Sequence, residues 1–116
     1  MTIKSCEIVI PSSFVKVDVA EVLNKRFGLE KWLYILHDKD KKPPHYHIYI
    51  CFREMISIFD IAKEFRIHDE FILSCVAMDI KALVLYLTHE YDSQRCKYIY
   101  AREELHSNIN LDVYLK

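Results

Sequence analysis

Residues 31–52, KWLYILHDKDKKPPHYHIYICF, contain two strand-like runs separated by a polar stretch. The runs Lys31–His37 and His45–Phe52 are rich in aromatic and β-branched residues, which favour extended backbone. The stretch Asp38–Pro44 between them is charged and contains two prolines, as expected for a loop. This pattern predicts an antiparallel hairpin with a long connection, around which the rest of the fold is arranged.

Segments on both sides of this hairpin alternate between strand-like and helix-like patterns. The further predicted strands are Cys6–Pro11, Phe71–Met78 and Lys97–Tyr100. The predicted helices are Val17–Phe27, Ser57–Phe65 and a segment from the N-cap Asp79 to about Glu90. This order predicts an α+β fold: a mostly antiparallel sheet of about five strands with flanking helices, closer to a ferredoxin-like arrangement than to a doubly wound parallel sheet.

The length and the apolar runs limit the organisation of the chain. Its 116 residues are expected to form a single domain, residues 1–116. Apolar runs such as Ile48–Phe52 are far shorter than the roughly 20 residues of a membrane span. Met1–Pro11 lacks the long apolar stretch of a signal peptide. We therefore expect no membrane contact and a cytoplasmic location.

Charge, glycine and cysteine content narrow the class of function. The formal net charge of −1 argues against a protein that coats nucleic acid by bulk charge, but it leaves room for a local nucleic-acid site. Gly28 is the single glycine, which excludes the Gly-rich phosphate loops of ATP- and dinucleotide-binding folds. The cysteines lie far apart and form no CxxC motif, which predicts buried, reduced thiols at Cys6, Cys51, Cys75 and Cys96.

Histidines gather in the hairpin in a pattern that suits a metal ion. Side chains alternate faces along a strand, so His45 and His47 point to one face and Tyr46 points to the other. His37 closes the preceding strand, and Asp40 follows in the loop, where it can bring an oxygen ligand toward the same point. Nitrogen and carboxylate ligands without a thiolate suit Mn²⁺, Mg²⁺, Fe²⁺ or Zn²⁺.

Two alternatives stand beside this interpretation of the hairpin. Asp38 lies in the same loop and is an alternative to Asp40 as the carboxylate ligand. Paired histidines on a strand are also common without any metal, because imidazole is widely tolerated. The metal prediction therefore depends on the third histidine and on the acid at the adjoining strand end.

The last predicted helix carries a candidate nucleophile. Tyr86 lies at the flank of its apolar stripe, where the ring can pack while the hydroxyl reaches toward the sheet. Beside a metal, such a hydroxyl can attack phosphorus and form a covalent ester. His89 is its neighbour one helical turn further along. The plainer alternatives are an ordinary boundary tyrosine and a solvated histidine on the polar face.

Three stretches in this order match a known family. His37-Asp-Lys-Asp40, Pro44–Tyr49 (PHYHIY) and Leu85–Glu90 (LYLTHE) resemble motifs of the origin-binding and nicking domain of rolling-circle plasmid replication initiators. These proteins belong to the HUH endonucleases, which are named for two histidines around a hydrophobic residue. The likeness is greatest to initiators of small plasmids of Gram-positive bacteria, and related initiators occur in phages and viruses.

The resemblance implies a complete reaction. It implies that Mn²⁺ or Mg²⁺ is held by His37, Asp40, His45 and His47, and that Tyr86 is the nucleophile. The substrate would be single-stranded origin DNA, presented as a hairpin loop. Attack by Tyr86 would leave a 5′-phosphotyrosine link and a free 3′-OH that primes synthesis, and reversal would rejoin the ends.

The resemblance also concerns the surroundings of the nucleophile. Tyr100 resembles a further tyrosine that lines the site in these initiators. Many viral relatives place a lysine three residues after the nucleophile, where this chain has His89. The resemblance therefore does not assign the residue that donates a proton to the leaving oxygen. His89 is expected to line the site.

DNA contacts and larger assemblies follow from the same interpretation. Basic side chains near the site are candidate contacts to DNA phosphates; they are Lys39, Lys41, Lys42, Arg95 and Lys97. Full plasmid initiators carry a C-terminal oligomerisation domain and viral ones a helicase, and neither fits in this chain. We expect a catalytic domain cut from a longer protein or an unusually small parent, with host replication proteins and an oligomeric parent as further partners.

Two other functions compete with replication initiation. A single-tyrosine HUH transposase would use the same chemistry on a mobile element, although the His-Asp-Lys-Asp stretch fits initiators better. A non-catalytic DNA-binding regulator would use the histidines for a structural metal or for none. A covalent, metal-dependent DNA adduct would distinguish an initiator or a transposase from a non-catalytic regulator.

Overall fold

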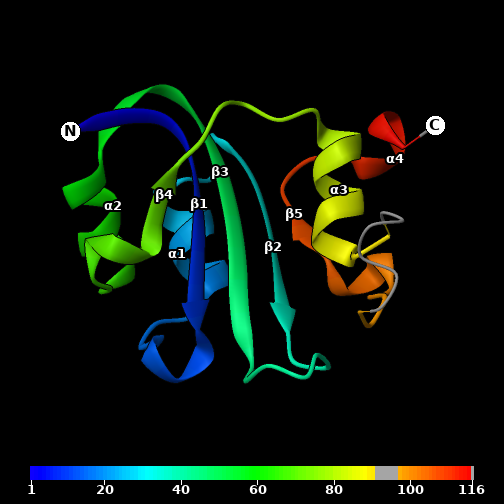
Figure 1. Ribbon diagram of the computed structural model, residues 1–116. Helices are drawn as coiled ribbons and strands as arrows, with labels where there is room; N and C mark the ends of the chain where they lie inside the picture. Colours follow the sequence, from blue (N-terminus) through cyan, green and yellow to red (C-terminus); the bar gives the residue numbers. More distant parts are fainter. Residues whose placement is uncertain (91–96, 116) are drawn as a thin grey trace.

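The hairpin of residues 31–52 lies inside a five-stranded sheet with the order β4-β1-β3-β2-β5 (Figure 1). The computed structural model describes residues 1–90 and 97–115. Its strands are β1 (Thr2–Pro11), β2 (Lys31–His37), β3 (His45–Ser57), β4 (Ile72–Ser74) and β5 (His106–Ser107). Every neighbouring pair is antiparallel, which confirms the predicted α+β fold with an antiparallel sheet.

Helices cover both faces of this sheet (Figure 1). α1 (Val19–Arg26) and α2 (Ile58–Phe65) pack on one face. α3 (Ile80–Thr88) and the short α4 (Leu111–Tyr114) pack on the other. Single turns of 3₁₀ helix occur at Ser12–Phe14, Asp69–Phe71 and Arg102–Glu104. None of the described helices is long and apolar enough to cross a bilayer.

The alternation of side chains along β3 separates two hydrophobic cores. Ile48 and Ile50 are buried against α1 and α2, whereas Tyr49 is buried against α3. In the register of the hairpin, His37 lies opposite His45 and Ile35 opposite His47. The histidines therefore occupy the α3 face of the sheet.

Tyr46 lies between the two histidines of β3 in sequence but packs against the core under α1 and α2. This placement confirms that Tyr46 and the histidines point to opposite faces.

α3 is held at both ends by local interactions. Asp79 caps its start, as predicted, because its Oδ2 accepts the backbone N–H of Ala82 at 3.1 Å. His89 adopts a left-handed conformation with φ of 65° and ends the helix, so α3 stops short of the predicted Glu90.

The structure differs from the sequence prediction near the C-terminus. Lys97–Tyr100 is not a strand: the N–H of Tyr100 bonds to the carbonyl of Thr88 at 2.9 Å, which ties this segment to the end of α3. The last strand is β5, and α4 follows it without a predicted counterpart. β4 is also shorter than the predicted Phe71–Met78, because the chain leaves the sheet after Ser74.

Cys6, Cys51 and Cys75 are free thiols, as predicted. Cys6 is fully buried, and burial raises its pKa to about 12. Cys51 and Cys75 are only partly buried, contrary to the expectation for all the thiols. Cys96 lies outside the described residues.

Candidate metal centre

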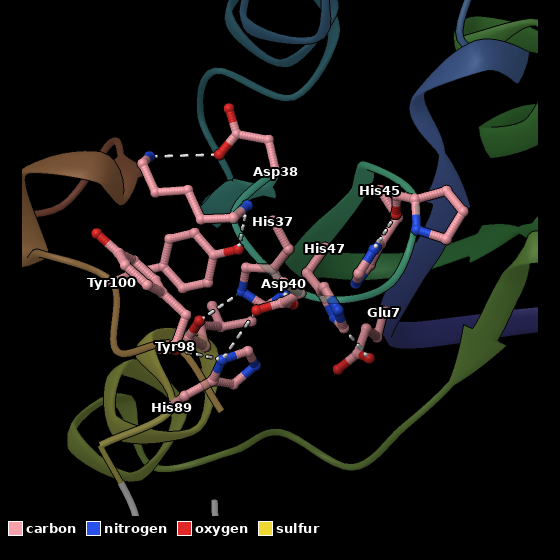
Figure 2. Close-up of polar contacts among 12 residues, drawn as sticks. Glu7, His37, Asp38, Asp40, His45, His47, His89, Tyr98 and Tyr100 are labelled. Carbon is pink, nitrogen blue, oxygen red and sulfur yellow. Dashed lines mark hydrogen bonds and ion pairs between the residues drawn. The ribbon is translucent and has the colours of Figure 1, made fainter. Parts of the chain in front are cut away.

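Three histidines converge where the hairpin strands meet the connecting loop (Figure 2). The ring centroid of His37 lies 4.4 Å from that of His47 and 5.2 Å from that of His45, and the last two are 5.0 Å apart. One ring nitrogen from each residue can be chosen so that all lie within 4.8 Å of one another. The predicted histidine ligands are thus brought together.

Asp40 belongs to a second, overlapping group. Its carboxylate groups with His37 and His89, and one possible ligand atom from each of these residues lies within 4.8 Å of the others. Asp40 Oδ2 is 3.8 Å from His37 Nδ1, and Oδ1 is 3.7 Å from His89 Nδ1. The predicted ligand set is therefore divided between two groups that share His37, and His89 joins the second.

His89 is buried, with 4% of its surface exposed, so the interpretation as a solvated histidine is wrong. Its left-handed backbone turns the ring away from the helix surface, and its Nδ1 donates a hydrogen bond to the carbonyl of Tyr98 at 2.9 Å. A helical wheel cannot place this side chain, because the residue has already left the helix.

Hydrogen bonds fix the orientation of two of the rings. His37 Nε2 donates to the carbonyl of Leu87 at 2.7 Å, and His45 Nδ1 donates to the carbonyl of Pro43 at 3.0 Å. Each ring therefore keeps its lone pair on the other nitrogen. Metal-binding histidines are commonly oriented in this way, by donating from the second nitrogen to a carbonyl or carboxylate.

Glu7 was not selected from the sequence, and the structure places it beside His47. One carboxylate oxygen lies 3.6 Å from His47 Nδ1, and the Glu7 side chain is 17% exposed (Figure 2). Pairing explains the position: Val9 of β1 lies opposite His47, and Glu7 lies opposite Tyr49 on the same face. The available signal was one acid within the predicted strand Cys6–Pro11, whose other residues are apolar.

Buried polar atoms provide a test of whether this site suits a cation. Among the described residues, His37 Nδ1, Asp40 Oδ1 and His47 Nδ1 are buried without a hydrogen-bond partner. Such atoms are costly to bury, at about 1–3 kcal/mol each, unless something binds them. Burial also lowers the pKa of His37 to about 4, which keeps its ring neutral at pH 7. A neutral imidazole is the form that binds metal, so these residues fit a divalent ion.

Asp38, the alternative carboxylate, lies away from the histidines. Its side chain is 43% exposed, and its Oδ1 is 3.3 Å from the ammonium of Lys39. That ammonium also pairs with Glu104. The structure thus favours Asp40 over Asp38 as the ligand.

Tyr86 lies on α3 facing the histidine cluster. Its ring is edge-on to that of His47, with 6.3 Å between centroids. The pKa of its hydroxyl is raised, first by burial and then by the negative charge of Glu7. The hydroxyl is therefore protonated at neutral pH.

Tyr100 is the other tyrosine of the predicted site. It is buried and stacks on His37, with 4.6 Å between centroids, and its hydroxyl accepts the N–H of Lys39 at 3.0 Å. Burial raises its pKa to about 12. These contacts suit a residue that holds His37 and the loop in place.

A cavity of about 820 Å³ opens onto the cluster. His37, His45, His47, Tyr86 and His89 contribute to its wall. Its mouth carries lysines from the hairpin loop and from the segment after α3, namely Lys39, Lys41, Lys42 and Lys97. Arg95, the remaining predicted DNA contact, lies outside the described residues.

Comparison with known proteins identifies a family for this chain. A family model described as the plasmid replication protein origin-binding domain matches residues 7–114. The match covers the hairpin, the histidine cluster and α3 together. A search of curated proteins finds no match.

Proposed function

Because the chain belongs to the plasmid replication protein origin-binding domain family, we propose that it binds the origin of its replicon and nicks it in a metal-dependent reaction. Membership of the family supports plasmid replication and origin binding. One observation carries the nicking chemistry: Tyr86 shares a cavity wall with the histidines that suit a divalent ion. The finer likeness to initiators of Gram-positive plasmids is part of this proposal.

In the proposed reaction the Tyr86 hydroxyl attacks the phosphorus of a single-stranded origin. A bond forms between the phenolic oxygen and phosphorus while the bond from phosphorus to the 3′ oxygen breaks. The phenolic proton is lost, and the leaving 3′ oxygen takes up a proton. The products are a 5′-phosphotyrosine link and a free 3′-OH, and the reverse reaction joins the ends.

The ion would be held by His37, His45 and His47, with Asp40 beside His37. When bound, Mn²⁺ or Mg²⁺ would polarise the scissile phosphate and oppose the effects that raise the pKa of Tyr86. The carbonyls of Leu87 and Pro43 hold the rings of His37 and His45 by hydrogen bonds, and the carboxylate of Glu7 lies 3.6 Å from His47 Nδ1.

The DNA would enter across the lysines at the cavity mouth. Lys41, Lys42 and Lys97 are exposed and line this mouth, so they are placed to contact phosphates. Lys39 is less suited, because its ammonium already pairs with Asp38 and Glu104. Arg95 remains a proposed contact. The same proposal includes interaction with host replication proteins, a cytoplasmic location and oligomerisation.

The experiment looks for a covalent DNA adduct. The protein is incubated with single-stranded hairpin oligonucleotides from its own replicon, with Mn²⁺ or with EDTA, and is run on a denaturing gel. We expect an adduct that resists SDS, requires the metal and is absent from Tyr86→Phe. Where the cleaved site lies then separates an initiator from a transposase.

Matched tyrosine variants sharpen this test. Tyr46→Phe alters the residue between the histidines on the opposite face, and Tyr98→Phe alters an exposed tyrosine of the same cavity. Both should form the adduct. An adduct that persists in Tyr86→Phe means that the nucleophile is wrong. Binding of the hairpins without any adduct favours a non-catalytic regulator.

A further inference from the structure

The histidine cluster offers a divalent ion more than one set of ligands. We propose that His37, Asp40 and His89 form a second binding position for the ion, adjacent to the position formed by His37, His45 and His47. This inference rests on the proposed divalent-ion requirement and assigns His89 the role of a ligand. His89 would then bind the ion instead of donating a proton to the leaving oxygen.

His89 has the properties of a ligand. It is 4% exposed, and its Nδ1 donates to the Tyr98 carbonyl at 2.9 Å, which leaves the lone pair of the ring on Nε2. The ring can therefore bind a cation without losing this hydrogen bond. The left-handed backbone at His89 is unusual for a residue other than glycine, and such conformations persist where the surrounding structure requires them.

Asp40 supplies the charge for this position. Its side chain is 12% exposed, and its Oδ1 is buried without a hydrogen-bond partner among the described residues. One possible ligand atom of Asp40 lies within 4.8 Å of one from His37 and one from His89. A carboxylate oxygen this poorly satisfied is more stable beside a divalent cation.

His37 links the two positions. Its Nε2 donates to the Leu87 carbonyl, so only Nδ1 has a lone pair, and Nδ1 is also buried without a hydrogen-bond partner in the described part of the chain. One lone pair binds one ion. The two positions are therefore alternatives, and the protein should bind a single ion at a time.

The two positions face different parts of the site (Figure 2). His45 and His47 lie toward Glu7, and the ring of Tyr86 lies beside that of His47. His89 and Asp40 lie toward Tyr98 and Tyr100. An ion at the second position is therefore farther from the residues that surround the proposed nucleophile.

Isothermal titration with MnCl₂, without DNA, tests this inference. We expect one Mn²⁺ per wild-type chain. His45→Ala/His47→Ala removes the first position. This variant should keep one site, with an affinity for Mn²⁺ that is about tenfold lower or more. Adding His89→Ala to this double variant should abolish the remaining binding.

Control variants separate ligand loss from loss of fold. His68→Ala in the same double variant should leave the remaining binding unchanged, because His68 is exposed and bonds to the N–H of Glu70 outside the cavity. His89→Asn, which tolerates left-handed backbone, replaces His89→Ala if that variant unfolds by circular dichroism.

Two outcomes would overturn the second position: no Mn²⁺ binding by His45→Ala/His47→Ala, or remaining binding that survives loss of His89. Different results would contradict the proposed function: a wild-type chain that binds no Mn²⁺, or a DNA adduct that forms equally well in EDTA.

Discussion

Glu7 shows how one charge connects the proposed ligands with the proposed nucleophile. Its carboxylate lies 3.6 Å from His47 Nδ1, and its charge contributes to the raised pKa of Tyr86. The same side chain is thus expected to strengthen metal binding and to weaken the acidity of the nucleophile. Glutamine is neutral and nearly the same shape as glutamate, so Glu7→Gln removes the charge while keeping the packing. The substitution therefore tests both effects of the charge.

We predict that Glu7→Gln lowers the pKa of Tyr86 in the metal-free protein, because one of the two causes of its increase is removed. Ultraviolet titration of the phenol measures this, with Tyr86→Phe in the same background identifying the signal. We also expect Mn²⁺ affinity to fall about tenfold to a hundredfold. Glu54→Gln, an exposed position on β3, should change neither quantity. Unchanged values in Glu7→Gln would contradict the role of Glu7.

The lowered pKa of His37 predicts a pH-dependent stability. Burial lowers this pKa from 6.5 to about 4, so the unfolded chain binds a proton that the folded chain resists. The unprotonated ring of His37 therefore makes its full contribution to the stability of the folded state above pH 6.5. This contribution is lost as the pH falls toward 4. We expect the free energy of unfolding to decrease by a few kcal/mol over this range.

Urea denaturation at a series of pH values measures this decrease, in metal-free buffer. His37→Gln should show a shallower dependence than the wild type. His106→Gln, an exposed histidine of β5, serves as the control and should retain the full slope. An equal slope in wild type and His37→Gln would refute the assignment.

At the scale of elements, α3 carries the proposed nucleophile and its ends are set by Asp79 and His89. Sequence predicted the beginning of this helix from its cap residue. It did not predict the end, because a left-handed histidine is not a usual stop signal. The hairpin was predicted more closely, since its strands and loop each have a distinct local composition.

We predict that Asp79→Ala lowers the free energy of unfolding by about 1 kcal/mol, because the N–H of Ala82 loses its acceptor. Thermal or urea unfolding checks this value. Asp60→Ala in the first turn of α2 is the control, because Asp60 is exposed and the cap of α2 is Ser57. A loss no greater than that of the control would show that the cap contributes nothing.

At the scale of the whole molecule, the cavity joins segments that are distant in sequence. Its wall includes residues of β1, the hairpin and α3, together with Tyr98 from the segment after α3. The chain has a net charge of −1, yet four of the described lysines line this cavity. Attraction to DNA is therefore expected to be local to the cavity mouth.

We predict that Lys41→Ala/Lys42→Ala and Lys97→Ala weaken binding of hairpin DNA and reduce its dependence on salt by about one charge per lost contact. Lys39→Ala should have a smaller effect, because that ammonium is paired with carboxylates. Fluorescence anisotropy at several salt concentrations measures both quantities. Lys25→Ala, an exposed lysine on α1, should match the wild type. Equal losses in all variants would indicate a nonspecific charge effect.

Errors in prediction occurred where local pattern and tertiary contact disagree. Lys97–Tyr100 has the composition of a strand, but Tyr100 is fixed by the carbonyl of Thr88 and by stacking on His37. The two-residue β5 has too little local pattern to be recognised. The sequence did not predict Glu7 at the site, and it predicted His89 to line the site but not to group with Asp40, because these contacts depend on strand pairing and on a helix end.

The sequence by itself determined the elements whose signals are local: the hairpin, the order of strands and helices up to α3, the face shared by His45 and His47, and the cap at Asp79. Strand alternation and capping act within a few residues, so a sequence pattern suffices for them. Only the tertiary structure decided that Asp40 groups with His89 and that Glu7 reaches His47. Those contacts depend on strand register and on pairing between buried polar atoms of different elements. A local sequence pattern contains neither kind of information.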